Sequence, residues 1–179
     1  MNTQKRHGSA FADEAAAKPQ EPPTAPHDVA LLPLKVAEDP AFNWCTTLLA
    51  NEMAGPNARL RARTWLTIGH WRGNVDAAAR VADKLVDNAV QHGKPFADGC
   101  IPLRLIVAAD THELLIEVDD AYPEFPSFDE AANQSGEVRG TPTGLWWVAH
   151  YGGRLSWDVK RSVDDVIVGK TAQAILPIT

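Results

Sequence analysis

Apolar and polar residues alternate along this chain with two periods, and the longest helical period lies between residues 75 and 92. The apolar stripe in this segment consists of Ala78, Ala82, Leu85 and Ala89, flanked by Val81 and Val86. Residues three or four positions apart share one face of a helix, so the pattern predicts an amphipathic helix that packs on a core. Asn74 is the expected N-cap, and Gly93 is the expected helix end.

A second helix is predicted between Ala58 and Trp71. Leu60, Thr64 and Ile68 form one row at a spacing of four residues, and two tryptophans add apolar bulk. We expect this row to face the core.

Five segments have the period or the composition of β-strands. Their ranges are 42–50, 101–108, 113–120, 154–160 and 168–177. The short polar connection between the second and the third predicts a β-hairpin, and a further helix is expected to begin at Gly144. This order favours an α/β protein: a two-layer α/β sandwich with a largely antiparallel mixed sheet and helices on one face.

Two segments lack a regular pattern. Residues 1–40 are rich in Pro, Ala and charge with almost no aromatics, and such a chain does not bury enough surface to offset the entropy of ordering. We therefore predict a disordered tail over residues 1–40 and one domain over residues 41–179. The loop 121–143, rich in Pro, Gly and acidic residues, is typical of a lid over a binding site or of a disordered segment.

Composition and charge narrow the classes of function. The chain has 179 residues and a net charge of −6, which disfavours a general nucleic-acid binder, because such proteins rely on clustered Lys and Arg. No apolar run approaches the ~20 residues of a membrane span, and the N-terminus does not have the pattern of a signal peptide. These features predict a cytoplasmic protein in which Cys45 and Cys100 are reduced and buried.

Lys84, Asn88 and His92 form a row at the border of the apolar stripe. An Asn in such a row can bind a hard cation through its carbonyl oxygen or a phosphate through its amide N–H. The alternative is an Asn that only bonds a nearby backbone group. The row by itself leaves both interpretations open.

Asp119 and Asp120 stand at the end of the predicted strand 113–120, before a turn that contains prolines. A carboxylate at a strand end can accept a hydrogen bond from an exocyclic amine, such as that of adenine. Asp is also common at such exits because it bonds the local backbone. Here too, both interpretations stay open.

The segment GTPTGLWW, residues 140–147, places glycines directly before a helix. Backbone N–H groups and the helix dipole at such a start favour a phosphate. The alternative is an ordinary helix capped by Thr143, and the segment matches neither a Walker A loop nor GxGxxG. For Trp146 and Trp147, two partly buried core residues are favoured over one exposed protein contact.

In their order, these segments resemble the boxes of the GHKL (Bergerat-fold) ATPases, the histidine-kinase-like ATPase superfamily. KLVDNAVQHG (84–93) resembles the family's helix motif ELVTNAVRHG, and IEVDDAYPEFP (116–126) resembles a second box of the form Val-x-Asp followed by Pro. GTPTGLWWVAHYGGRLSW (140–157) resembles the third box, and GKTAQAILP (169–177) resembles the closing Gly-Lys-Thr strand. The similarity covers residues 42–179 and points to the small bacterial anti-sigma-factor serine/threonine kinases.

The resemblance implies a Mg²⁺·ATP site. Asn88 would coordinate the Mg²⁺ that bridges the ATP phosphates, and Asp120 would accept the adenine amine. Thr171 would lie on the sheet floor near the adenine, His92 would lie near the site, and the loop 121–139 would form its lid. The residues that would line the phosphates are Gly140, Thr143, Gly144 and Leu145.

Lys84 stands where the family usually has the Glu that orients or deprotonates the attacking group. A lysine is charged at pH 7 and is a base only if its pKa is strongly lowered. It can contact phosphate as a point charge, or it can be an ordinary lysine at a helix edge. Asp83 and Asp87 lie about 100° away around the helix and do not substitute cleanly for that Glu.

The resemblance therefore implies an ATP-binding regulatory protein of the anti-sigma kinase type. Its protein partner would be a sigma factor or an anti-sigma antagonist, which it would bind or phosphorylate. The alternative, favoured by Lys84 and the acidic loop, is a catalytically inactive member that acts as a nucleotide-responsive or purely protein-binding module. Family members often work as homodimers, and the sequence leaves both catalysis and oligomeric state open.

Overall fold

A computed structural model describes residues 33–126, 128 and 144–178 of the chain. The elements follow one another as β1 (Pro40–Leu49), α1 (Ala54–Ile68), α2 (Val75–His92), β2 (Cys100–Ala108), β3 (Leu114–Asp120), α4 (Trp146–His150), β4 (Arg154–Arg161) and β5 (Ile167–Leu176). The predicted order of strands and helices is confirmed, and α2 has the bounds expected from its stripe and its cap.

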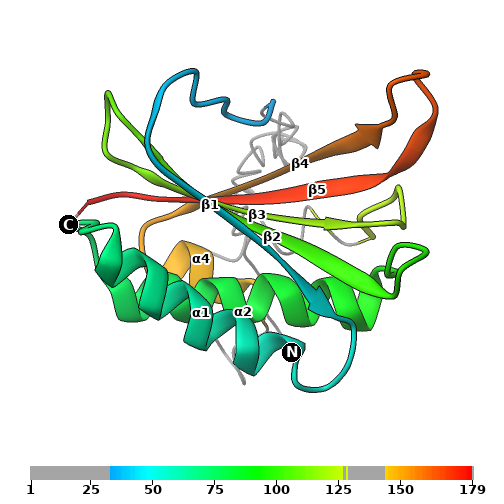
Figure 1. Cartoon of the computed structure of the whole chain (residues 1–179), viewed down its shortest axis with the longest axis horizontal. Coiled ribbons are helices and arrows are strands. Elements are labelled where there is room, and N and C mark those ends of the chain that lie inside the picture. Colours follow the sequence, from blue (N-terminus) through cyan, green and yellow to red (C-terminus); the bar gives the residue numbers. More distant parts are fainter. Residues whose placement is uncertain (1–32, 127, 129–143, 179) are drawn as a thin grey trace, which may run out of the picture.

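The five strands form one sheet in the order β1-β2-β3-β5-β4, in which every neighbouring pair is antiparallel. The helices α1, α2 and α4 all cover one face of this sheet (Figure 1). The predicted two-layer α/β sandwich is confirmed, although the sheet of the described residues is antiparallel throughout rather than mixed. No helix in this part of the chain has the length and apolar character needed to cross a membrane.

The buried face of α1 differs from the predicted one. Leu60 and Ile68 are 65% and 56% exposed, and the residues that α1 buries are Ala54, Gly55, Ala58, Ala62 and Leu66. Small residues allow two helices to approach closely: a Cβ added at Gly55 would lie only 2.1 Å from a carboxylate oxygen of Asp87 on α2. The predicted row is therefore wrong, because close packing selected the small residues over the larger apolar ones.

The helix α2 carries the row of candidate site residues. The Asn74 side chain accepts a hydrogen bond from the backbone N–H of Ala77 at 3.0 Å, so the predicted cap is confirmed. The stripe of α2 is buried in the main core together with residues of β2, β3 and β5. Because this stripe faces the sheet, the polar row beside it is held at the edge of the helix layer, next to α4.

The structured domain begins before residue 41. The backbone N–H of Lys35 donates to Oε1 of Gln173 at 2.9 Å, and Nε2 of Gln173 donates to the Lys35 carbonyl at 2.8 Å. Part of the segment assigned to the tail is thus attached to β5, while residues 1–32 lie outside the described residues.

The two cysteines are free, as expected, but they are not buried: Cys45 is exposed and Cys100 is half-buried. In β1 the inward residues alternate with exposed ones, and Cys45 belongs to the exposed set. The predicted burial is therefore wrong, because Cys45 lies on an edge strand and points away from the helices.

Candidate nucleotide site

A pocket of about 220 Å³ lies where the second half of α2 meets the start of the α4 segment. Its lining residues are Lys84, Asp87, Asn88, Gln91, His92, Gly144 and Trp147. The tertiary structure therefore brings Asn88 and His92 of the first sequence box next to Gly144 of the third. Most of the lining side chains are polar, which suits a charged ligand better than an apolar one.

Lys84 lies in this pocket as a charged group. Its ammonium donates to Oδ2 of Asp87 at 2.8 Å and lies 3.7 Å from Oδ1 of Asp83. The hydrogen bond to Asp87 raises the pKa of Lys84 above its ordinary value, although burial opposes the rise. Lys84 is therefore protonated at neutral pH and does not replace a catalytic Glu as a base.

Asp87 also lines this pocket. It lies about 100° from Asn88 around the helix, which predicted that it does not substitute cleanly for the family's Glu, yet both residues line the same pocket. A pocket at a helix edge is wide enough to include neighbouring positions, and Lys84 reaches across to Asp87. A carboxylate oxygen and an amide oxygen are therefore available on one wall, which are ligand types that Mg²⁺ accepts.

The Asp83 side chain is more buried than that of Asp87, and both carboxylates lie against Gly55 of α1. Burial raises the pKa of Asp83, and the charge of Lys84 opposes this rise. The described residues contain no group of three or more His, Cys, Asp or Glu that could hold a metal ion. A Mg²⁺ at Asn88 would therefore take most of its oxygens from the bound phosphates and from water, as Mg²⁺ commonly does in nucleotide sites.

Asp120 lies on the helix side of the sheet, against the end of α2. A Cβ added at Gly93 would lie 2.6 Å from Cγ of Asp120, so the second box adjoins the first as expected. The carboxylate, however, is already bonded. Oδ1 of Asp120 accepts from Nζ of Lys170 and from the backbone N–H of Tyr122, both at 2.9 Å.

Burial raises the pKa of Asp120 above its ordinary value, although the hydrogen bonds from Lys170 and Tyr122 oppose this rise. The group that would accept the adenine amine is thus buried and occupied by a lysine of the same chain. The phosphate end of the expected site, at Asn88, and the base end, at Asp120, differ in how well they suit a nucleotide. The pocket at Asn88 suits Mg²⁺ and phosphate, whereas the base end does not accept adenine in this conformation.

Thr171 does not lie beside Asp120. In the ladder between β3 and β5, Asp119 pairs with Thr171 and Asp120 pairs with Lys170. Successive side chains of a strand point to opposite faces, and Oγ1 of Thr171 donates to Oδ1 of Asp119 at 2.7 Å on the outer face. The predicted position of Thr171 is corrected by this register: Lys170 is the residue that faces the helix side.

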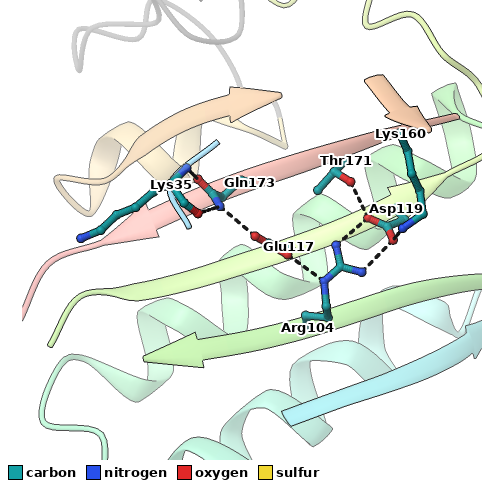
Figure 2. Close-up of polar contacts among 7 residues, drawn as sticks. All are labelled: Lys35, Arg104, Glu117, Asp119, Lys160, Thr171 and Gln173. Carbon is teal, nitrogen blue, oxygen red and sulfur yellow. Dashed lines mark hydrogen bonds and ion pairs between the residues drawn. The ribbon is translucent and has the colours of Figure 1, made fainter. Parts of the chain in front are cut away.

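Asp119 is the centre of a polar network on the outer face of the sheet (Figure 2). Both terminal nitrogens of Arg104 donate to its carboxylate at 2.7 Å, and Nζ of Lys160 donates at 2.6 Å. Burial alone would raise the pKa of Asp119, but these hydrogen bonds outweigh it and hold the pKa below its ordinary value. Asp119 is therefore a structural residue, and of the two adjacent carboxylates only Asp120 faces the candidate site.

The third box is described from Gly144 onward, and Gly140 and Thr143 lie outside the described residues. Gly144 is exposed at the pocket, whereas Leu145 is buried in the main core and is not among the residues that line the pocket. Trp146 is buried, and Trp147 is half-buried with the guanidinium of Arg80 4.5 Å from its ring centroid. Both tryptophans thus contribute to packing, as the favoured interpretation expected.

No protein-family model and no curated protein matches the sequence. Among solved structures, the chain is similar to the mycobacterial sensor histidine kinase MprB, with 21% identity and a TM-score of 0.39, over 59% of this chain and 74% of that chain. It is also similar to the histidine kinase domain from the Erythrobacter litoralis EL346 blue-light activated histidine kinase, with 21% identity and a TM-score of 0.34. That match covers 58% of this chain and 46% of the other, so this chain spans less than half of its length.

Proposed function

We propose that the protein is a cytoplasmic regulatory protein that binds Mg²⁺·ATP in the pocket between α2 and α4 and acts on a protein partner. The observation that carries this proposal is the pocket in which Asn88 and His92 meet Gly144. These residues come from two of the boxes that resemble GHKL ATPases, far apart in the sequence. The partner suggested by the same resemblance is a sigma factor or an anti-sigma antagonist.

Within this site, Asn88, Lys84 and Gly144 would contact different parts of the Mg²⁺·phosphate group. The amide oxygen of Asn88 would hold the Mg²⁺, which neutralises phosphate charge when bound. Lys84 would exchange its partner Asp87 for a phosphate oxygen, since a phosphate competes well for an ammonium group. Gly144 is exposed at the same pocket, and its backbone N–H would be the group that contacts an anion there.

Transfer of phosphate to the partner is slow or absent in this proposal. The usual Glu is replaced by Lys84, whose pKa is raised by Asp87, so the position does not supply a base. The second candidate function is a module that binds only a protein partner. The bonded and buried state of Asp120 favours it, because the carboxylate that would accept adenine is already held by Lys170 and does not line the pocket.

Calorimetric titration of Mg²⁺·ATP into the full chain tests the proposal. Asn88→Ala is expected to weaken binding by about tenfold or more, because the metal ligand is lost. The matched control is Asn57→Ala, which removes an exposed Asn from α1 and should leave the affinity unchanged. Asp120→Ala is less suitable here, because it changes two things at once: it removes the proposed acceptor of the adenine amine and it releases Lys170 from its partner.

Equal affinity in the wild type and in a folded Asn88→Ala variant would contradict the proposed site. Absence of binding in the wild type would favour the purely protein-binding module, provided that a variant without the Lys170 ammonium also fails to bind. Titration of the Lys170 variants described below separates these two cases.

A further inference from the structure

The base end of the candidate site is closed by the chain's own Lys170. Nζ of Lys170 lies 2.9 Å from Oδ1 and 2.9 Å from Oδ2 of Asp120, and it donates to the carbonyl of Tyr122 at 3.0 Å. The ammonium thus has an oxygen partner for each of its three N–H groups. The side chains of Lys170 and Asp120 are only 3% and 2% exposed, so water does not screen the pair.

Four aromatic residues cover this ion pair, and we call them the aromatic cover: Tyr122, Phe125, Phe128 and Trp157. Nζ of Lys170 lies 5.3 Å from the ring centroid of Tyr122 and 5.6 Å from that of Phe125. The Phe125 ring in turn lies 5.2 Å from Phe128 and 6.0 Å from Trp157 of β4. Tyr122 and Phe125 therefore lie against the Lys170 ammonium, and Phe128 and Trp157 pack on Phe125, so a ligand that reaches Asp120 from this side would have to move part of the cover.

One polar group of the aromatic cover lacks a hydrogen-bond partner among the described residues. Nε1 of Trp157 is buried and has no hydrogen-bond partner among the described residues. A buried donor without a partner costs free energy, and in native proteins such groups are uncommon. An arrangement in which a ligand with acceptor atoms replaces part of the cover would remove this cost.

Competition for Asp120 favours the lysine. An ammonium forms a charge-assisted hydrogen bond with a carboxylate, whereas the exocyclic amine of adenine is a neutral donor. A ligand that takes the carboxylate would also have to move a buried cation away from its partner, which is strongly unfavourable unless the cation reaches water. The free energy of nucleotide binding at Asp120 is therefore reduced by the cost of displacing Lys170.

We propose that Lys170 is an internal competitor for the ligand amine at Asp120 and that this contact limits the nucleotide affinity of the protein. The inference rests on the proposed function, because it concerns the same nucleotide site. Lys170 is thus the affinity-determining residue at the base end, while Asn88 acts at the phosphate end. The pair holds the site closed until a ligand, or a partner that moves the aromatic cover, releases Asp120.

The test is a calorimetric titration of Mg²⁺·ATP into the full chain carrying Lys170→Met. Met keeps the length of the side chain and removes the ammonium, so the variant should bind about tenfold more tightly than the wild type. Lys170→Arg keeps a cation on Asp120 and should bind no more tightly than the wild type. Lys170→Gln, which can still donate a hydrogen bond to Asp120, is expected to change in the same direction as Lys170→Met and serves if the Met variant does not fold.

The outcomes separate this inference from the proposed function. Binding that depends on Asn88 in the wild type but is no tighter in the folded Met and Gln variants would overturn the role of Lys170 and leave the nucleotide site standing. Absence of binding in the wild type and in both neutral variants would overturn both proposals. Binding that appears or strengthens only when the cation is removed, and that Asn88→Ala abolishes again, would support both.

Discussion

At the scale of single residues, Asp119 and Asp120 show how two identical neighbours acquire different properties. They follow each other in β3, so their side chains point to opposite faces of the sheet. Asp119 meets Arg104 and Lys160, which keep its pKa low, whereas burial next to the single cation Lys170 leaves the pKa of Asp120 raised. The chemistry of each carboxylate is thus decided by the face on which it lies.

Asp119→Asn is expected to destabilise the protein at pH 7 and to flatten its acid response. Lys160 would lose its carboxylate partner and Arg104 would keep only Glu117. Because both cations are partly exposed, the loss is about 2 kcal/mol, below the cost of breaking a fully buried pair. In the wild type the folded pKa of Asp119 lies below its ordinary value of 3.8. Its ionisation therefore stabilises the fold above that value, and this contribution is lost as the pH falls through the folded pKa.

Urea unfolding at a series of pH values between about 7 and 2 measures this effect as the free energy of unfolding. The variant should lose less stability than the wild type over the acid part of the series. Asp164→Asn, an exposed carboxylate, is the control and should follow the wild type. Parallel curves for Asp119→Asn and the wild type would show that Asp119 is not held in its charged form.

At the scale of elements, the buried faces of α1 and α2 differ in the number of large apolar residues that they contain. The buried face of α2 also contains alanines, but Val81, Leu85 and Val86 accompany them, and Asn74 caps the helix. The buried face of α1 consists of three alanines, one glycine and a single large apolar residue, Leu66. A periodic search follows large apolar residues, so it locates the first face and misses the second.

Substitution of two leucines of α1 tests which face of this helix is buried. Leu66 is 0% exposed and Leu60 is 65% exposed. Leu66→Ala should lower the free energy of unfolding by about 2–5 kcal/mol, because it leaves a cavity in the core. Leu60→Ala should change it by less than about 0.5 kcal/mol, since surface substitutions have small effects.

Urea unfolding of the two variants compares the same chemical change on one helix. A larger loss for Leu60→Ala than for Leu66→Ala would mean that α1 is rotated relative to the structure described here.

At the scale of the whole molecule, Gln173 joins the start of the domain to its last strand. It is buried, it holds the backbone of Lys35 through two hydrogen bonds, and it donates to Oε1 of Glu117 at 2.8 Å. Glu117 in turn accepts from Arg104, so the outer network runs from residue 35 across three strands (Figure 2). On the face of the sheet opposite α1, α2 and α4 (Figure 1), this network and the attached segment at Lys35 take part in covering the sheet.

Gln173→Leu is expected to release the segment 33–37 from the sheet without unfolding the domain. The variant removes both hydrogen bonds to Lys35, so the amide of Lys35 should exchange its hydrogen about tenfold faster or more, by analogy with other locally opened segments. Hydrogen–deuterium exchange measured by mass spectrometry or NMR reports this change. The amides of α2 serve as the internal control, and unchanged protection at Lys35 would show that other contacts hold the segment.

The sequence by itself determined the elements, the two-layer arrangement and the polar row of α2 that lines the pocket. Periodicity, the Asn74 cap and the row Lys84, Asn88 and His92 are local signals, so they are readable along the chain. Only the tertiary structure decided that Asp87 shares the pocket with Asn88, that small residues bury α1, and that Lys170 rather than Thr171 lies against Asp120. The reason is physical: strand register and helix approach depend on the packing of distant segments, and a shift of one residue moves a side chain to the other face of the sheet.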